Sequence, residues 1–184
     1  MTKVVNMVVS TQLTDSIDLY DVSAKLGIDY EAEQFPGMVY RVKIPKVCIL
    51  LFRSGKAVVT GAKSKKDVKT GLKILHDDLT SHGFELWDYD KTKVNIENIV
   101  VTYEWTGGDL DLSNLIVSMP FDKTEYEPEV FPGLIYRIDN PKSVCLVFSS
   151  GKCVITGCKS KEEAKEATNQ LIHELTIAPP SEYE

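Results

Sequence analysis

The sequence predicts an α+β fold made of two related halves, in which helices cover one face of an antiparallel sheet. The first observation is a repeat: the 36 residues Tyr30–Lys65 recur without a gap at Tyr126–Lys161, and 21 of the 36 positions are identical. Similarity at this level indicates an internal duplication. The second observation is that both copies show one order of elements: strand, short helix, antiparallel strands and long helix. We expect two pseudo-symmetric repeats, 1–92 and 93–184, in one continuous unit.

Residue type and spacing predict the individual elements. Each copy begins with a short strand rich in β-branched residues, at 3–11 and 94–102. Turn residues then separate three further strands of the first copy, at 38–44, 47–52 and 57–60. Apolar spacing of three and four residues, together with helix-end signals, predicts helices at 18–27, 64–82, 111–118 and 160–175. The segment 84–91 links the copies, and we expect the acidic tail 178–184 to be disordered.

Composition places the chain among ordinary globular proteins, with 43% hydrophobic and 26% charged residues. No stretch approaches the roughly 20 apolar residues that a membrane span needs. The amino terminus lacks the layout of a signal peptide, so we expect an intracellular protein. The cysteines do not have zinc-site spacing, and we expect buried, reduced thiols with no metal and no cofactor. These cysteines are Cys48, Cys145, Cys153 and Cys158.

Charge is distributed unevenly along the chain. The net charge of −6 at first argues against a nucleic-acid partner, because attraction to phosphate needs a basic surface. However, residues 1–92 carry 13 basic and 12 acidic residues, whereas residues 93–184 carry 8 and 15. The span 35–66 holds eight basic residues and no acidic one. The sequence therefore allows one cationic face on an acidic protein.

The central strands are apolar on both faces. Val47–Phe52 and Val144–Phe148 lack the alternation of polar and apolar residues that a half-exposed strand shows. Because helices can cover only one face of the sheet, the other face should meet something other than water. An uncovered apolar face of this size indicates a binding surface.

Repeated phenylalanines and asparagines indicate what could bind there. One phenylalanine of each copy enters a Phe-Pro-Gly turn, and another, 17 residues later, ends a strand: Phe35, Phe52, Phe131 and Phe148. Asn6 and Asn98 recur two residues before a valine, inside strands where asparagine is unusual. Apolar wedges, an apolar floor, central amides and flanking cations suit the DNA minor groove, which over A·T pairs offers mainly acceptors.

The motifs that carry these residues resemble the TATA-binding protein family in its archaeal form. They are F-P-G-[ML]-[VI]-Y-R, F-x-S-G-K-x-V-[VI]-T-G-x-K-S and an Asn-x-Val strand, each present twice, and the resemblance runs from about Val4 to Leu175. It implies a saddle: a ten-stranded curved antiparallel sheet with four helices on its convex face. It also implies a general transcription initiation factor that binds and kinks A·T-rich promoter (TATA) DNA.

The resemblance assigns roles to individual residues. The wedges would be Phe35, Phe52, Phe131 and Phe148. The residues at the central base pairs would be Asn6, Thr60, Asn98 and Thr156. The apolar floor would be Val8, Leu50, Val58, Val100, Leu146 and Val154. Phosphates, which position the protein without reading sequence, would be held by Arg41, Ser54, Lys56, Arg137, Ser150 and Lys152.

The implied partners are double-stranded promoter DNA, a transcription factor B-type protein and the RNA polymerase machinery, in the cytoplasm of an archaeal cell or the nucleus of a eukaryotic one. The transcription factor B-type protein would dock on Glu127, Glu129 and Val130, and the acidic charge of this half suits a basic partner. The uncovered face also offers a surface for self-association of the DNA-free protein. The chain departs from eukaryotic members at Gln34, where a basic residue is common just before the first wedge. Its long helices are less basic than those of many relatives.

Two other readings compete with DNA binding. An enzyme is disfavoured because no histidine has a paired nucleophile or carboxylate motif, and no phosphate loop or metal constellation appears. A protein-binding adaptor would use the apolar sheet face for a partner peptide or helix. The central asparagines and the cations beside the phenylalanines favour DNA over the adaptor.

Overall fold

The computed structural model describes residues 1–178. Its helices are α1 (Leu19–Leu26), α2 (Lys65–Ser81), the 3-10 turn η1 (Tyr89–Lys91), α3 (Leu112–Ser118) and α4 (Lys161–Ile177). Strands of the amino-terminal half are β1 (Lys3–Gln12), β2 (Gly37–Val42), β3 (Val47–Phe52) and β4 (Lys56–Ala62). Those of the carboxyl-terminal half are β5 (Val94–Glu104), β6 (Thr124–Glu125), β7 (Leu134–Asp139), β8 (Lys142–Val147) and β9 (Lys152–Cys158). All four predicted helices are present. The tail that we expect to be disordered lies outside the described residues from 179 onwards.

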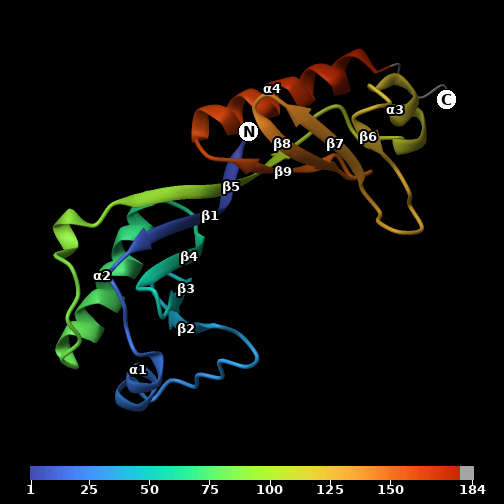
Figure 1. The fold of residues 1–184 in the computed structure, drawn as a ribbon. Coiled ribbons are helices and arrows are strands. Elements are labelled where there is room, and N and C mark those ends of the chain that lie inside the picture. Colours follow the sequence, from blue (N-terminus) through green and yellow to red (C-terminus); the bar gives the residue numbers. More distant parts are fainter. Residues whose placement is uncertain (179–184) are drawn as a thin grey trace. The chain divides into compact units, whose positions relative to one another are not determined.

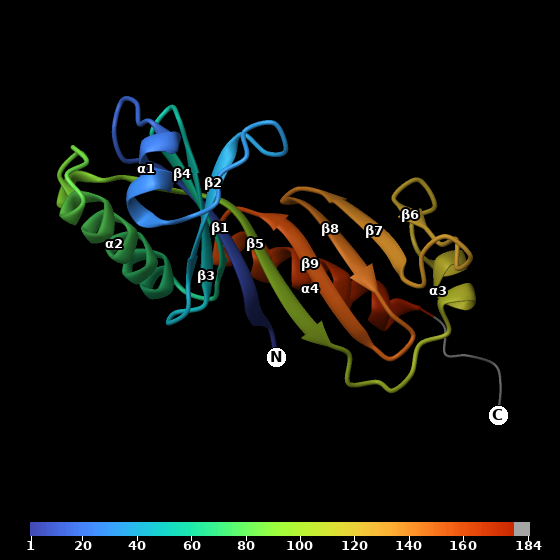
Figure 2. The same ribbon diagram turned by 90° about the horizontal axis from the view of Figure 1, so that it is seen from below.

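The strands form one antiparallel sheet in the order β2-β3-β4-β1-β5-β9-β8-β7-β6. The chain divides into two compact units, Asn6–Glu97 and a second unit of Met1–Val5 with Asn98 onwards. We call these the first and second units. In the first, α2 packs on β2, β3 and β4, and in the second, α4 packs on β9 (Figures 1 and 2). The α+β class with one antiparallel sheet and four helices is confirmed, while the saddle and the repeat boundary stay predictions.

The predicted count of ten strands is wrong, because nine lie within the described residues. The short strand β6 has no counterpart in the first unit, although Thr124 corresponds to Ile28 at the 96-residue offset. There Gly27 ends α1 in the left-handed conformation, and the Ile28 N–H donates to the Ser23 carbonyl. Ile28 therefore bonds back to the helix rather than to β2.

Capping side chains begin the two long helices where the sequence predicted. The Ser64 hydroxyl accepts from the Asp67 N–H, and the Ser160 hydroxyl accepts from the Glu163 N–H at 3.0 Å. Glu163 in turn accepts from the Lys159 N–H, close to the predicted capping box. Each cap satisfies backbone donors that the first helical turn leaves without partners.

The core lies between the helices and one face of the sheet. Strand β3 alternates strictly: Val47, Ile49 and Leu51 are buried, whereas the residues between them are half-buried. Gly71 of α2 permits close packing here, since a Cβ at this position would lie 2.7 Å from Cγ2 of Val47. In α4 the same position is the buried Ala167. A small residue thus occupies this position of the long helix in both units.

Candidate nucleic-acid interface

The face of the sheet opposite the helices is apolar and half-exposed in both units. Strand register places Val39, Leu50 and Val58 side by side in the first unit, because each pairs directly with the next. Ile135, Leu146 and Val154 repeat the arrangement in the second unit. Cross-strand partners share one face of a sheet. Of the predicted apolar floor, Leu50 lies beside Val58 and Leu146 lies beside Val154. The other two predicted members, Val8 and Val100, are half-buried and lie at the register shifts of β1 and β5.

Sequence reasoning missed part of this face. Val39 and Ile135 pair with predicted floor residues, and Cys48 and Val144 pair with the predicted threonines Thr60 and Thr156. All of these side chains are half-buried. Strand periodicity could have identified Val39 and Ile135, since each lies two residues before a predicted arginine and so points to the same side.

In each predicted pair of phenylalanines, the two rings pack against each other at the end of this face. The rings of Phe35 and Phe52 lie 6.1 Å apart between centroids, and those of Phe131 and Phe148 lie 5.8 Å apart, both edge to face. Phe35 is 40% exposed and the other three rings are half-buried. None of the four is a core residue, so each pair presents an aromatic surface at the sheet face.

The glycine of the Phe-Pro-Gly motif makes room for these rings. A Cβ on Gly37 would lie 2.8 Å from Cε1 of Phe35 and 3.0 Å from Cε1 of Phe52. In the second unit, a Cβ on Gly133 would lie 2.9 Å and 3.1 Å from the corresponding ring atoms. Any larger residue would displace the ring tips, which explains why the motif contains glycine in both copies.

The two asparagines are oriented by a bulge in the neighbouring strand. Between Met7 and Val9 the register with β4 shifts by one residue, and Gly61 in the bulge adopts φ +88°. The Gly61 N–H donates to Oδ1 of Asn6 at 2.7 Å. Because Oδ1 of Asn6 accepts this hydrogen bond, its amide NH₂ group remains available to donate to another partner.

The second unit repeats this arrangement. The Gly157 N–H donates to Oδ1 of Asn98 at 2.7 Å, with the same register shift between Ile99 and Val101. Nδ2 of Asn98 donates to Oγ1 of Thr156 at 3.1 Å, which brings the predicted asparagine and threonine into contact. The bulge therefore presents amide donors beside the apolar floor in both units.

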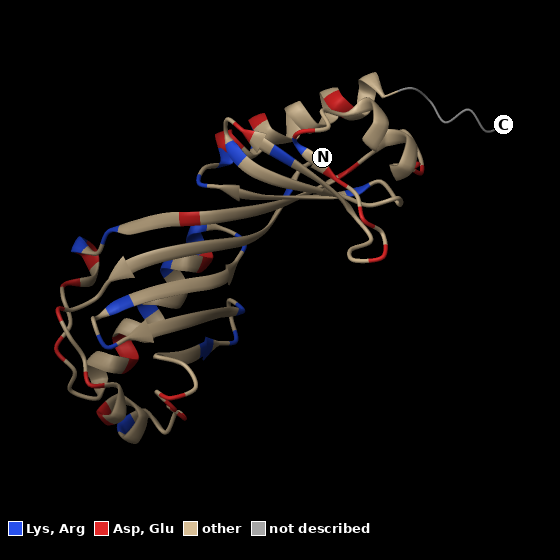
Figure 3. Cartoon of the chain, turned by 45° about the vertical axis from the view of Figure 1, so that its right-hand side comes forward, with Lys and Arg blue, Asp and Glu red and all other residues tan. Residues whose placement is uncertain are grey.

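Cations and turn hydroxyls surround the face. The predicted phosphate-binding residues are all exposed: Arg41, Ser54, Lys56, Arg137, Ser150 and Lys152. The turns are tight, with the Gly55 N–H donating to the Phe52 carbonyl and the Gly151 N–H to the Phe148 carbonyl, both at 2.9 Å. Figure 3 shows Lys and Arg at the strand ends and turns of the first unit. A depression of about 500 Å³ there is lined by cations and by half-buried Cys48 and Thr60.

The predicted partner-binding residues lie on the loop between β6 and β7, which Figure 3 shows to be acidic. Glu127, Glu129 and Val130 are all exposed, and Val130 is 80% exposed. The Glu127 carbonyl accepts from the N–H groups of Val130 and Phe131, both at 2.9 Å. This turn joins the acidic loop directly to one of the aromatic residues.

Comparison with known proteins identifies the family of the chain. The family model described as Transcription factor TFIID (or TATA-binding protein, TBP) matches residues 1–82 and 93–177. The chain belongs to the TATA-binding protein family. The TATA-box-binding protein of Methanocaldococcus jannaschii is 45% identical over 171 residues, which cover 92% of this chain and 91% of that protein. That of Archaeoglobus fulgidus is 42% identical over 174 residues, or 94% and 93% of the two chains.

A solved structure gives the same result. The "Methanococcus jannaschii TBP" structure superposes with a TM-score of 0.86 at 44% sequence identity, covering 95% of this chain and 98% of that one. The expected resemblance to the archaeal form of the family is thereby confirmed. The family is one of transcription factors and not a class of enzymes. Within the described residues, no helix is long and apolar enough to cross a membrane.

In this TATA-binding protein family member, three of the four cysteines are buried thiols, as predicted, but Cys48 is only half-buried on the sheet face. Burial raises the pKa of Cys145 to about 12 and that of Cys153 to about 11. The Cys158 pKa is also raised, mainly by burial. Cys48 differs because it occupies the face without helices, which sequence spacing did not reveal.

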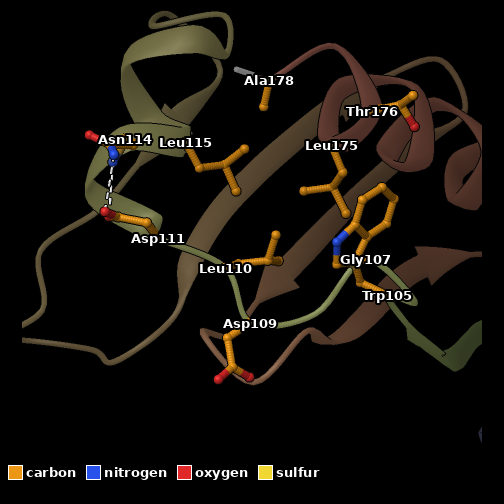
Figure 4. A pocket seen from close by; sticks show the side chains of 10 residues that line it. All are labelled: Trp105, Gly107, Asp109, Leu110, Asp111, Asn114, Leu115, Leu175, Thr176 and Ala178. Carbon is orange, nitrogen blue, oxygen red and sulfur yellow. Dashed lines mark hydrogen bonds between the residues drawn. The ribbon is translucent and has the colours of Figure 1, made fainter. Parts of the chain in front are cut away.

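A separate cavity of about 390 Å³ lies between α3, the end of α4 and the loop that follows β5 (Figure 4). Leu110, Leu115, Leu175 and Trp105 supply its apolar walls. Nδ2 of Asn114 donates to Oδ2 of Asp111 at 3.1 Å on its rim. None of the predicted DNA-binding or partner-binding residues lines this cavity.

Proposed function

We propose that the protein is a general transcription initiation factor that binds the minor groove of A·T-rich promoter (TATA) DNA. The observation that carries this proposal is the half-exposed apolar face, which ends in an aromatic pair and bears a fixed asparagine amide in each unit. Membership of the TATA-binding protein family supports it.

Base preference follows from the chemistry of the face. Over A·T pairs the minor groove presents only N3 and O2 acceptors, which the amide NH₂ groups of Asn6 and Asn98 can meet. A G·C pair adds the guanine amino group, a donor. That donor would face the hydrocarbon of residues such as Leu50 and Leu146 and lose its hydrogen bonds to water. The face therefore favours A·T pairs by both attraction and exclusion.

The aromatic pairs supply the means of kinking. Apolar side chains inserted between base steps unstack them and bend the duplex. Phe35 with Phe52 and Phe131 with Phe148 are preformed for this role, since each pair is packed edge to face before DNA binds. Exposed cations such as Arg41, Lys56 and Lys152, together with the turn serines, then hold phosphates and fix the register of the protein on the duplex.

The acidic loop supplies a docking site for the next factor. We assign Glu127, Glu129 and Val130 to a transcription factor B-type protein, through which the complex nucleates assembly with RNA polymerase. The two carboxylates attract a basic partner, and the exposed Val130 offers an apolar contact among them.

A binding titration tests the proposal against the protein-binding adaptor. We expect the protein to bind and bend an A·T-rich duplex at moderate salt and to bind a G·C-rich duplex of equal length much more weakly. Gel shift measures affinity, and energy transfer between dyes on the two duplex ends measures bending. Equal affinity for the two duplexes, or no binding with the fold intact, would exclude minor-groove readout and favour the adaptor.

A further inference from the structure

Two acidic residues of the second unit lie on the face assigned to DNA. Ile135, Arg137 and Asp139 alternate along β7 and so point to the same side of the sheet. Glu125 of β6 pairs directly with Ile135 and therefore shares that side. Carboxylates repel phosphate, so their position on this face needs a physical explanation.

Both acids form ion pairs with cations of the same edge. Oδ2 of Asp139 lies 3.0 Å from Nζ of Lys123, and Oε2 of Glu125 lies 3.7 Å from the Arg137 guanidinium. The Arg137 N–H also donates to the Lys123 carbonyl at 2.8 Å, which holds β6 beside β7. At this edge two positive charges are balanced by two negative ones.

The corresponding edge of the first unit carries a different charge. At the 96-residue offset, Arg41 corresponds to Arg137 and Asp29 to Glu125, so these two charges are kept. Lys43 stands where the second unit has Asp139, and Gly27 stands where it has Lys123. The balance at these four positions is therefore one net positive charge. Within residues 1–178, neither Arg41 nor Lys43 forms an ion pair, and both side chains are exposed.

We propose that Glu125 and Asp139 withhold Arg137 and Lys123 from DNA phosphates, so that the first unit makes the stronger phosphate contacts. This inference rests on the proposed DNA binding and adds a division of roles between the units. The first unit holds the backbone through Arg41 and Lys43. The second unit has a neutral edge and depends more on its aromatic pair and apolar floor.

Salt dependence separates the two contributions. Each phosphate contact that is lost lowers the slope of log K against log salt concentration by roughly 0.9, because fewer counterions are released on binding. Arg41→Ala should lower the slope by about this amount, and Arg137→Ala should lower it clearly less. Asp139→Lys, which copies the first unit, should raise both affinity and slope.

The experiment uses the full chain and one palindromic A·T-rich duplex, titrated by fluorescence anisotropy across a salt series. Lys43→Asp, which copies the second unit, is the reciprocal variant and should lower the slope. The exposed side chains leave the fold intact, which circular dichroism checks for each variant.

The results distinguish failure of the proposed difference between the units from failure of the proposed DNA binding. Equal slopes for Arg41→Ala and Arg137→Ala, together with no change in Asp139→Lys, would overturn the proposed inequality while leaving DNA binding in place. Absence of binding by the unmodified protein would overturn the proposed function and this inference with it.

Discussion

Oδ1 of Asn98 accepts a hydrogen bond from the Gly157 N–H at 2.7 Å, across the bulge between β5 and β9. Gly157 takes φ +100°, a conformation that favours glycine, and the bulge leaves its N–H outside the regular ladder. One carbonyl oxygen therefore completes the bulge and turns the amide NH₂ group toward Thr156 and the sheet face.

Asn98→Ala removes both functions of this side chain. We expect a loss of stability of about 0.5–1.5 kcal/mol, because the Gly157 N–H loses its protein acceptor. We also expect weaker discrimination between A·T and G·C at one central base pair. Urea unfolding measures the first effect, and binding to duplexes with single substitutions measures the second. Asn98→Asp is the control: it keeps the acceptor and loses the NH₂ donor, so unchanged base discrimination in this variant would contradict the assigned role.

Phe148→Ala breaks one aromatic pair. We expect both affinity and bending of the A·T-rich duplex to fall, since Phe131 then lacks the ring that packs against it at 5.8 Å. Energy transfer between dyes on the duplex ends reports the bend. Phe121, which is 90% exposed between α3 and β6, provides the matched control through Phe121→Ala. Equal loss of bending in the two variants would show that the effect is not specific to the pair.

Glu129→Arg reverses one charge on the acidic loop. We expect DNA affinity to be retained and recruitment of the transcription factor B-type protein to be lost, because the basic partner meets a like charge. A supershift assay on promoter DNA measures both steps. Glu162→Arg on α4 makes the same change in net charge at another exposed position. An intact ternary complex with Glu129→Arg would place the partner site elsewhere.

Buried thiols make stability fall at alkaline pH. The folded state keeps Cys153 protonated up to a pKa of about 11, whereas an unperturbed thiol ionises near 9.0. Between these values the unfolded chain has released the proton and the folded protein still binds it, so rising pH favours unfolding. Urea midpoints should therefore drop from pH 9 to pH 11. Cys153→Ala, which copies the buried Ala57 of the first unit, should reduce the drop, and an identical pH dependence would refute this contribution.

Much of the fold was predictable because the internal duplication presents the same sequence motifs twice. The helix at 64–82 had a serine cap and a regular apolar stripe, and the helix at 160–175 had a capping box. Both formed within a few residues of the predicted bounds. The strand at 47–52 formed with the predicted ends. These features depend on residues close together in the sequence, whose spacing is visible without a structure.

The errors involve contacts between distant segments. Whether 28–29 forms a strand depends on whether its backbone bonds to β2 or to the end of α1. The exposure of Cys48 depends on which face α2 covers, and the ion pair between Lys123 and Asp139 depends on β6 lying beside β7. The period of two along β3 could have placed Cys48 on the face of Leu50. The hydrogen bond of Ile28 and the ion pair of Lys123 have no periodicity that a sequence pattern could reveal.

The sequence by itself determined the duplicated α+β plan, the apolar strands and the repeated phenylalanines, because residue type and spacing govern local structure and burial. The tertiary structure alone decided where the donors and charges of the face point. The bulge glycines fix the amides of Asn6 and Asn98, and the pairing of β6 with β7 places Glu125 beside Arg137. These outcomes arise from hydrogen bonds and ion pairs between segments that only folding brings within about 4 Å of each other.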